Sequence, residues 1–438
     1  MATTSRLPGF YKFSVRERRE LVATATSVPA DEIGAALVGG GIDADSADKF
    51  VENVLGCYAL PFAVALNIRI NDKDYIAPMV VEEPSVVAAA SSAAKMVRDG
   101  GGFKAEVDAP LMVSQIQLIG VKDRDAATRA ILAEKKAICE IADRAIPGLV
   151  SRGGGARDVE VRKLNPPNPV PGADEMLVVH IVIDCRDAMG ANLVNNAAEA
   201  VADRLAALAN GQVGLRILSN LCDKRCVRVS CRVPAASLAT EGMEGSRVID
   251  GILNASAFAE ADPYRAATHN KGIMNGVDAV VIATGNDWRA VEAGAHAYAA
   301  RSGHYSPLAV WRREGDTLVG KMQIPLALGT VGGTLRVHPA ARMALRLVNP
   351  ESAGELAMLA AAVGLASNLA AVRALGTEGI QRGHMALHAR SVALAAGASG
   401  GDVERVALMI VEARDITLEG AKRALASLSG EISRKISE

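Results

Sequence analysis

One stretch of the sequence, residues 265–287, concentrates side chains that could do chemistry on a glycine-punctuated backbone. It holds cations, amides and a carboxylate among three glycines: Arg265, His269, Lys271, Asn275, Asp287, Gly272, Gly276 and Gly285. Buried polar groups need partners and glycine allows close backbone approach, so this density is typical of a site. Lys271 and Asp287 could act as a general acid and the carboxylate that tunes it. A glycine-rich loop before a core helix, with a surface lysine and a helix-capping aspartate, is an equally good interpretation.

The spacing of Lys271 and Asp287 sets a geometric condition for that chemistry. They are 16 positions apart, which is about 24 Å on one straight helix. The plausible breaks are 270–272 and 284–286, where asparagine and glycine interrupt the pattern. We predict that the segment folds back and brings Lys271 into near contact with Asp287.

Two other places carry weaker signs of a site. Glu83 precedes Pro84 at a predicted helix start, where a carboxylate is stabilised by the helix dipole or, if buried, becomes a proton donor. Its neighbour Glu82 stays open as an alternative. The run 187–192 follows an apolar strand and opens a helix whose free N–H groups suit a phosphate. An ordinary capped helix is the alternative, because the run is no G-x-G-x-x-G fingerprint.

His384 and His388 lie four residues apart, as a metal pair on one helical face would. Position 385 is Met, where the zinc protease motif needs Glu, and no third ligand suggests itself. We therefore predict no metal site and favour His384 as a proton donor beside a C-terminal tail.

Composition and charge narrow the class of protein. The 438-residue chain has a net charge of -1, so bulk charge makes no case for nucleic acid or an anionic membrane as a partner. Its six cysteines match no zinc or redox spacing, which indicates free thiols in a cytoplasmic protein. The N-terminus lacks an apolar stretch, so we expect no signal peptide. The longest apolar span, 356–375, contains Ser, Asn and Arg and predicts a buried helix rather than a membrane span.

The elements that must position these residues follow from periodicity. Short helices are predicted over 14–55, a hairpin over 63–79 with its turn at Asn71-Asp72, and a helix to about Val97. A strand–helix–strand–strand–helix–strand order over 105–218, with one long helix at 125–146, predicts an inserted ferredoxin-like domain. The fold class is therefore α+β. The remaining assignments are strands at 226–233, 308–313 and 317–324, and helices at 246–259, 288–298 and 351–374.

The predicted division is 1–104 with 219–376 as a large domain, 105–218 as the small domain, and 377–438 as a helical flap after the long apolar helix. The motifs, taken together and in order, resemble the class II, bacterial branch of the hydroxymethylglutaryl-coenzyme A (HMG-CoA) reductases. The matching stretches cover essentially the whole chain: 52–56, 81–85, 153–155, 187–192, 262–276, 283–288, 332–333 and 379–388.

The resemblance implies an oxidoreductase that interconverts (R)-mevalonate plus coenzyme A with HMG-CoA, through mevaldehyde and with two nicotinamide equivalents. Lys271 then matches the cation that stabilises the reacting oxygen, and Asp287 the carboxylate that holds it. Glu83 matches the acid that handles protons, and His384 the group that protonates the departing thiolate. The family's active site lies at a dimer interface, so a homodimer or an assembly of dimers is implied.

The resemblance also assigns binding residues. Ser85, Arg265 and Asn275 match substrate contacts and Asn220 is a further candidate, while the small domain is the nucleotide-binding one, through Asp187, Met189, Gly190 and Asn192. NAD is the first choice of cofactor, although no ribose-binding carboxylate can be placed near 143–147, and NADP is the alternative. An acyltransferase or thioester hydrolase without redox chemistry is the alternative function, and the missing G-x-S-x-G nucleophile argues against it. The direction in the cell, degradation or synthesis of mevalonate, stays open.

Overall fold

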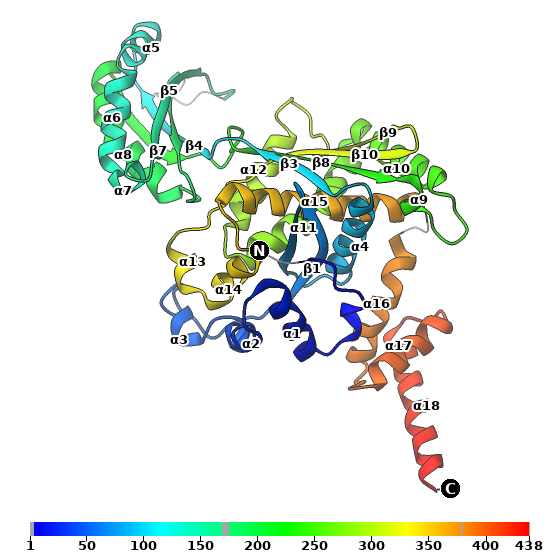
Figure 1. The fold of residues 1–438 in the computed structure, drawn as a ribbon. Helices are drawn as coiled ribbons and strands as arrows, with labels where there is room; N and C mark the ends of the chain where they lie inside the picture. Colours follow the sequence, from blue (N-terminus) through cyan, green and yellow to red (C-terminus); the bar gives the residue numbers. More distant parts are fainter. Residues whose placement is uncertain (1–3, 169–174, 378–379, 438) are drawn as a thin grey trace.

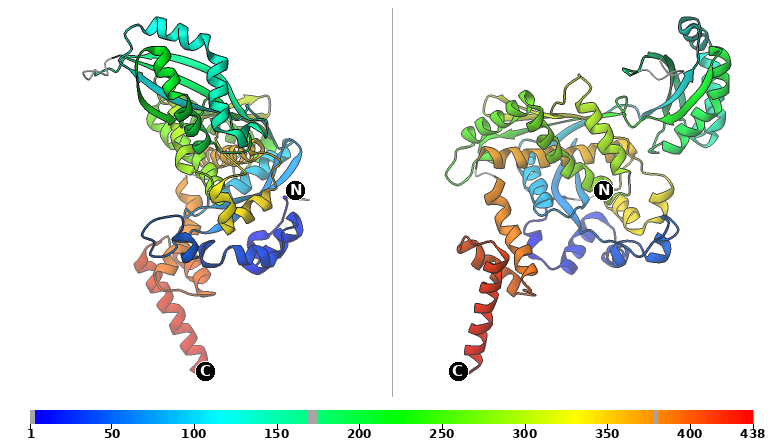
Figure 2. Two further views of the ribbon diagram at one scale, coloured as in Figure 1. Left: turned by 90° about the vertical axis from the view of Figure 1, so that its left-hand side faces the viewer. Right: turned by 180° about the vertical axis from the view of Figure 1, so that it is seen from behind.

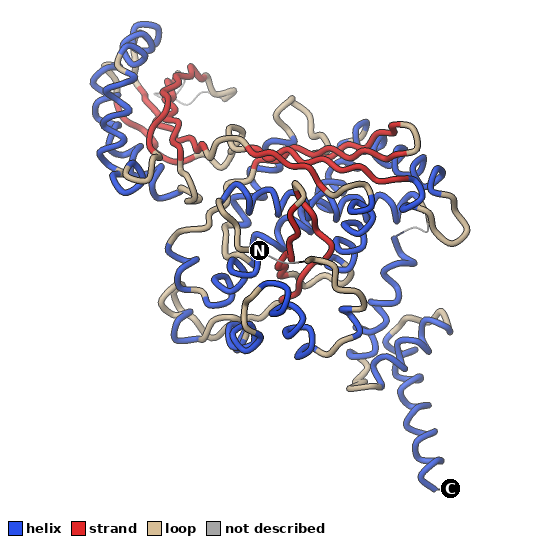
Figure 3. Tube along the Cα trace, in the orientation of Figure 1, coloured by secondary structure: helices blue, strands red, loops and turns tan. Residues whose placement is uncertain are grey.

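The structure is a computed structural model that describes residues 4–168, 175–377 and 380–437, without the side chains of 334, 380–387 and 429–437. It has a large body, a small domain at one end and a helical extension at the other (Figure 1). The two sheets belong to different parts of the molecule, as the tube drawing shows (Figure 3). The expected α+β class is confirmed.

The body is built on a six-stranded sheet. Its order is β2-β1-β3-β8-β10-β9, and all neighbours are antiparallel except β1 and β3. The strands are β1 (Phe62–Ile70), β2 (Lys73–Val80), β3 (Phe103–Val107), β8 (Cys226–Pro234), β9 (Ala309–Glu314) and β10 (Thr317–Pro325). The predicted turn between β1 and β2 is confirmed, because Asn71 and Asp72 have the positive φ values of 48° and 69° that a tight hairpin turn requires.

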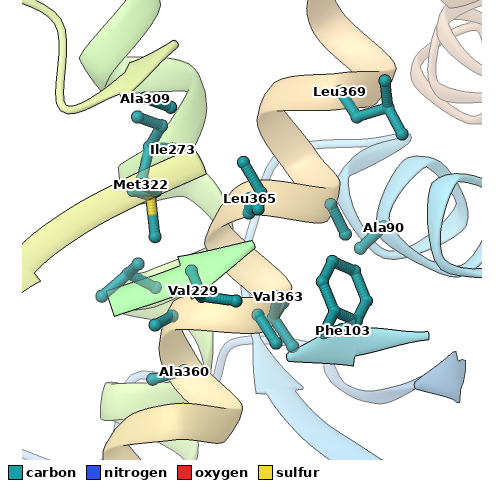
Figure 4. Packing of buried hydrophobic residues seen from close by; sticks show 14 of the residues in the cluster. Ala90, Phe103, Val229, Ile273, Ala309, Met322, Ala360, Val363, Leu365 and Leu369 are labelled. Carbon is teal, nitrogen blue, oxygen red and sulfur yellow. The ribbon is translucent and has the colours of Figure 1, made fainter. Parts of the chain in front are cut away.

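Helix α15 (Ala353–Gly376) is the centre of the body. Among the described residues it alone is long and apolar enough to cross a membrane, yet 83% of its most apolar window is buried inside the protein. A helix that is apolar all round is expected in the core of a large domain. Figure 4 shows Val363 and Leu365 of this helix packed among Phe103 of β3, Val229 of β8 and Ile273 of α11. The interpretation of this span as a buried helix is confirmed.

Helices cover the sheet and α15. Those of the body are α1 (Val15–Thr26), α2 (Ala30–Ala36), α3 (Ala44–Ala47), α4 (Val86–Asp99), α9 (Ala235–Leu238), α10 (Gly245–Ala261), α11 (Pro263–Ala283), α12 (Trp288–Ala299), α13 (Gly333–Val337) and α14 (Pro339–Val348), with 3₁₀ turns at Phe10–Lys12 and Val38–Gly40. Gly276 lets α11 lie directly against α15, because a Cβ atom there would be 2.4 Å from the Ser367 hydroxyl and 2.7 Å from the Val363 carbonyl oxygen.

The small domain is a four-stranded antiparallel sheet of order β5-β6-β4-β7 with its helices on one face (Figure 2). Its elements are β4 (Leu111–Ile119), α5 (Arg124–Ala133), α6 (Lys135–Ala145), α7 (Pro147–Val150), β5 (Gly155–Leu164), β6 (Met176–Asp184), α8 (Ala191–Ala209) and β7 (Gln212–Leu218). The order and the helix placement are those of a ferredoxin-like fold, as predicted. This domain has a hydrophobic core of its own.

The C-terminal helices α16 (Ile380–Ala395), α17 (Asp402–Glu412) and α18 (Leu418–Ser437) also have a separate core, and they project from the body below α15 (Figure 1). The segment that was predicted as a helical flap therefore contains three helices, α16, α17 and α18.

Three further predictions need correction. The long helix at 125–146 is interrupted at Glu134, whose backbone (φ −104°, ψ 16°) ends α5 and starts α6. Pro84 is not the first helical residue, because α4 begins at Val86 with Ser85 as its N-cap. The boundary between residues 104 and 105 falls inside β3, which pairs with β8 in the large sheet.

Candidate active site

Glu83 and Ser85 lie in the short connection between β2 and α4. Ser85 has a φ of 75°, a conformation that costs energy for a residue with a side chain. Its hydroxyl oxygen is buried and, within the described residues, has no hydrogen-bond partner. Strain combined with an unsatisfied buried hydroxyl is found where a ligand completes the structure. The turn therefore holds a polar group without a partner two residues from Glu83.

Lys271 meets Glu83 from the middle of α11. Lys271 Nζ lies 2.6 Å from Glu83 Oε2, although the two residues are 188 positions apart. The side chains are 59% and 37% exposed, and exposed ion pairs contribute between about 0 and 1 kcal/mol to stability. Folding gains little from this pair. Its value is to hold an ammonium group and a carboxyl group together at an accessible surface.

Asp287 lies at the other end of α11 and starts α12. Its Oδ1 accepts a hydrogen bond from the Ala290 amide at 3.1 Å, which caps the helix. The chain turns here because the amides of Gly285 and Asn286 bond back to the carbonyl oxygens of Ile282 and Val281, the Schellman pattern. Gly285 is required, with φ 68° and a Cβ position only 2.8 Å from Ala341.

These positions correct the predicted pairing of Lys271 with Asp287. Helix α11 runs without interruption through 270–272, so only the second of the two expected breaks occurs. Lys271 is more than three turns from the end of the helix, about 18 Å along its axis. In the described part of the chain its carboxylate partner is Glu83. Asp287 lies beyond the end of α11, so the two residues are not on one helix. Within a single chain, however, Lys271 and Asp287 do not form an ion pair.

The turn at Asp287 is fixed to the loop that was predicted to hold the cofactor. The Asn286 side chain donates to the Gly329 carbonyl oxygen at 3.2 Å and accepts from the Gly329 amide at 2.7 Å. Gly329 lies close to Met189, because a Cβ atom added to Gly329 would be 2.6 Å from the Met189 amide nitrogen. The Thr330 amide donates to the Asp187 carbonyl oxygen at 2.9 Å. Asp287 and the loop are thus neighbours in one hydrogen-bonded assembly.

The loop itself leads into the N-terminus of α8. Gly190 has φ 110°, and no side chain caps the 19-residue helix, which leaves its first amides unbonded. Asp187 accepts from the Ala353 amide at 2.8 Å, and Arg225 donates to the carbonyl oxygens of Ala188 and Met189. Met189 is half-buried and Asn192 is exposed. These bonds hold the loop in place, and the unbonded first amides of α8 fit the phosphates of a dinucleotide.

Arginines add positive charge beside this loop. Arg186 packs on Gly153, where a Cβ would be 2.8 Å from its guanidinium, and Arg157 donates to the Gly153 carbonyl oxygen at 2.6 Å. Arg186 Nε lies 3.8 Å from Asp184 Oδ1, and Arg157 Nη2 lies 3.2 Å from Asp184 Oδ2. Two guanidinium groups, those of Arg157 and Arg186, therefore lie against one carboxylate, and the excess positive charge suits an additional phosphate.

The other predicted residues are distributed between these places. Arg265 is half-buried in the first turn of α11, and burial lowers the pKa of its guanidinium. Asn275 lies one turn after Lys271 on the same face of α11. Asn220 is exposed and lies beside α12. Its backbone carbonyl oxygen would be 2.7 Å from a Cβ atom added to Gly294 of that helix. His384 falls in α16, but its side chain lies outside the described residues.

Some of the polar residues that made this stretch look like a site are structural. His269 Nε2 is 3.1 Å from the Ala309 carbonyl oxygen, and burial lowers its pKa to about 4. Asn270 bonds the backbone of Ser306 and Leu308. Sequence reasoning also missed Asp278, which lies in an otherwise apolar run at the end of α11. The position seven residues after Lys271, on the same helical face, could have revealed it.

The buried cysteines offer no nucleophile. All six are free, and burial raises the pKa of Cys185 and Cys231 to about 12 and that of Cys222 to about 11. A thiol needs a lowered pKa to attack a carbonyl group. In the described residues no group of three or more His, Cys, Asp or Glu side chains is placed to hold a metal ion.

The sequence of this chain is similar to those of proteins from one enzyme family. Residues 14–389 match the family model of hydroxymethylglutaryl-coenzyme A reductase. The chain is 47% identical to the 3-hydroxy-3-methylglutaryl-coenzyme A reductase of Archaeoglobus fulgidus, over 98% of this chain and 95% of that protein. It is 33% identical to a probable enzyme of the same name from Borreliella burgdorferi, over 78% and 77%.

Solved structures agree with the sequence relatives. The reductase of Streptococcus pneumoniae superimposes with a TM-score of 0.80 at 41% identity, over 96% of this chain and 99% of that one. A structure of the class II enzyme from the same organism, bound to NADPH in open conformations, gives a TM-score of 0.79 at 41% identity over 84% and 99%.

Proposed function

The chain belongs to the hydroxymethylglutaryl-coenzyme A reductase family, and from that premise we propose how its residues divide the reaction. The protein is an oxidoreductase that interconverts HMG-CoA with mevalonate and coenzyme A. The observation that carries the residue assignment is the Lys271–Glu83 pair at 2.6 Å, accessible to a ligand and next to the unsatisfied Ser85 hydroxyl.

Lys271 stabilises the oxygen on which negative charge develops. A bound nicotinamide supplies hydride in each of the two reductions, first of the thioester and then of mevaldehyde. In both, the carbonyl oxygen becomes an oxyanion, so one ammonium group placed there favours both transition states. Glu83, in contact with that ammonium, delivers or removes the proton of the same oxygen.

His384 and Asp287 complete the catalytic set. His384 protonates the thiolate of coenzyme A as it leaves, which suits a residue on a helix of the separate C-terminal domain. Asp287 fixes and tunes the lysine of the assembled site. Since the two residues are apart in one chain, Asp287 does this for a second copy of the protein. A homodimer, or an assembly of dimers, with the site at the interface therefore forms the functional unit.

Substrate contacts come from residues close to Lys271. Ser85 offers its hydroxyl, Asn275 its amide one turn along α11, and Arg265 a guanidinium that meets the substrate carboxylate. Asn220, beside α12, contacts the substrate from the half of the site that contains Asp287. The substrates are small molecules of the cytoplasm: mevalonate, HMG-CoA and coenzyme A.

The cofactor is a nicotinamide dinucleotide held by residues 187–192 of the small domain. The uncapped α8 amides would donate hydrogen bonds to its pyrophosphate. Asp143, the carboxylate nearest the position where NAD-using relatives carry one, is engaged by the Ala156 amide at 2.7 Å. Arg157 and Arg186, beside Gly153, provide positive charge instead. We expect this chain to accept NADP, with its 2′-phosphate at these arginines, in preference to NAD.

A redox-free acyltransferase or thioester hydrolase is the weaker candidate, since the buried cysteines and the absent serine motif supply no nucleophile. The test is a spectrophotometric assay of the purified protein. Mixed with mevalonate, coenzyme A and either NAD or NADP, it is expected to reduce the cofactor, faster with NADP. Absence of turnover with both cofactors in both directions would exclude the function, and faster turnover with NAD would exclude the cofactor assignment.

A further inference from the structure

Asp278 is a carboxyl group that the reaction does not use, yet it lies on the helix that carries Lys271, about two turns further along. It follows Lys271 and Asn275 on the same face of α11, at positions i, i+4 and i+7. Its Oδ1 is buried and has no partner within the described residues. Its side chain forms a hydrogen bond with Glu292 of α12. A carboxyl group with this burial and this neighbour needs an explanation.

Two carboxyl groups in hydrogen-bonding contact must share a proton. If both were ionised, neither would have a hydrogen to donate, and their charges would repel in a poorly solvated environment. Burial and Glu292 raise the pKa of Asp278 to about 9. Glu292 is in contact with a second group, because its Oε2 lies 2.6 Å from His296 Nε2. The proton therefore resides on Asp278 at neutral pH.

The pair belongs to a chain of contacts that returns to α11. His296 Nδ1 is 2.7 Å from the Tyr305 hydroxyl, and the two rings stack at 5.9 Å. Tyr305 in turn forms a hydrogen bond with the side chain of Asn270. The chain thus touches α11 at two points, Asn270 and Asp278. These two positions bracket Lys271 and Asn275.

The same contacts join the two helices that carry catalytic groups. Helices α11 and α12 form a hairpin around Gly285, and Asp278 and Glu292 are each seven residues from that glycine. Helix α11 carries Lys271, and α12 begins at Asp287. We propose that Asp278 and Glu292 are positioning residues, whose shared proton locks α11 against α12 and fixes Lys271 on the first helix and Asp287 at the start of the second, each in the half of the site that it serves. This inference rests on the proposed function.

Other charges near α11 are engaged elsewhere. On the elements packed against it, Glu260 of α10 pairs with Arg312, Arg98 of α4 with Asp74, Glu355 of α15 with Lys73, and Arg346 of α14 with Glu32. Lys271 itself pairs with Glu83. The groups that face Asp278 are therefore Glu292 and, behind it, His296 and Tyr305. Loss of the Asp278 proton at alkaline pH places a second negative charge beside Glu292 and opens the hairpin.

The test compares Asp278→Leu with Asp278→Asn in the full-length enzyme, with Asp316→Asn in the exposed β9–β10 turn as a control. The leucine variant cannot bond Glu292, and we expect kcat to fall by about tenfold to a hundredfold. The asparagine variant donates an amide hydrogen that does not titrate, so it recovers most of that loss. Its alkaline fall in kcat moves to higher pH by about one unit or more.

A spectroscopic measurement keeps the proposal testable if the leucine variant fails to fold. Infrared difference spectra of the unaltered protein at neutral pH are expected to contain a protonated carboxyl band that Asp278→Asn lacks. The proposal is overturned if this band is absent, or if Asp278→Asn keeps the alkaline limb of the unaltered enzyme. An unaltered protein without reductase activity would instead refute the proposed function, so the two failures can be told apart.

Discussion

The two halves of the site are built in different ways. Around Lys271 and Glu83 the groups are exposed and joined by a single ion pair between side chains. Around Asp287 and residues 187–190 the backbone itself is fixed, by Asn286 on Gly329, Thr330 on Asp187 and Arg225 on Ala188. The first half therefore provides charged side chains that can adjust to a ligand, while the second half provides a backbone held in a fixed position. Substitutions should therefore affect chemistry in the first half and geometry in the second.

The largest effect is expected in the exposed half. Lys271→Ala removes the cation that meets the oxyanion and should lower kcat by about 100- to 1,000-fold. Thermal unfolding should hardly change, because the pair is exposed. Steady-state kinetics and calorimetry measure the two quantities. Lys104→Ala is the matched control, since Lys104 is also 59% exposed and pairs with Asp72 at 2.7 Å. Equal losses in both variants would contradict the catalytic assignment.

An intermediate effect is expected in the rigid half. Asn286→Ala removes both bonds to Gly329, each worth about 1 kcal/mol, and frees the turn before Asp287. We expect kcat to fall by about tenfold, and the KM for the cofactor to rise because residues 187–190 lose their support. Asn254→Ala, exposed on α10, serves as control. A change in the KM for mevalonate alone would erase the distinction between the halves.

The smallest effect concerns the edge of the rigid half. Arg186→Ala removes one cation beside Gly153 and should weaken the preference for NADP by about tenfold, the value of one charged hydrogen bond to phosphate. Turnover with NAD should be unaffected. Arg204→Ala, which breaks an ion pair with Glu134 in the same domain, is the control. If turnover with NAD and with NADP fell together, Arg186 would support the loop 187–190 rather than bind the 2′-phosphate of NADP.

Much of the fold could be predicted because local patterns decide it. Alternation predicted the strand at 226–233 that the structure has as β8, Asn71-Asp72 predicted the hairpin turn, and the long apolar span predicted α15. The break at Glu134 had no Gly or Pro to mark it, so one helix was predicted where two exist. The site was found through family resemblance rather than periodicity, since polar residues with structural and chemical roles look alike in sequence.

The sequence by itself determined which residues could do chemistry and that 284–286 is a turn, since glycine and asparagine adopt positive φ at low cost. Only the tertiary structure decided which side chains are in contact. It joined Lys271 to Glu83 across 188 positions, separated Lys271 from Asp287 by an unbroken α11, and placed Glu292 against Asp278. The physical reason is that backbone preferences act over a few residues, whereas contacts between side chains depend on how whole helices pack around α15.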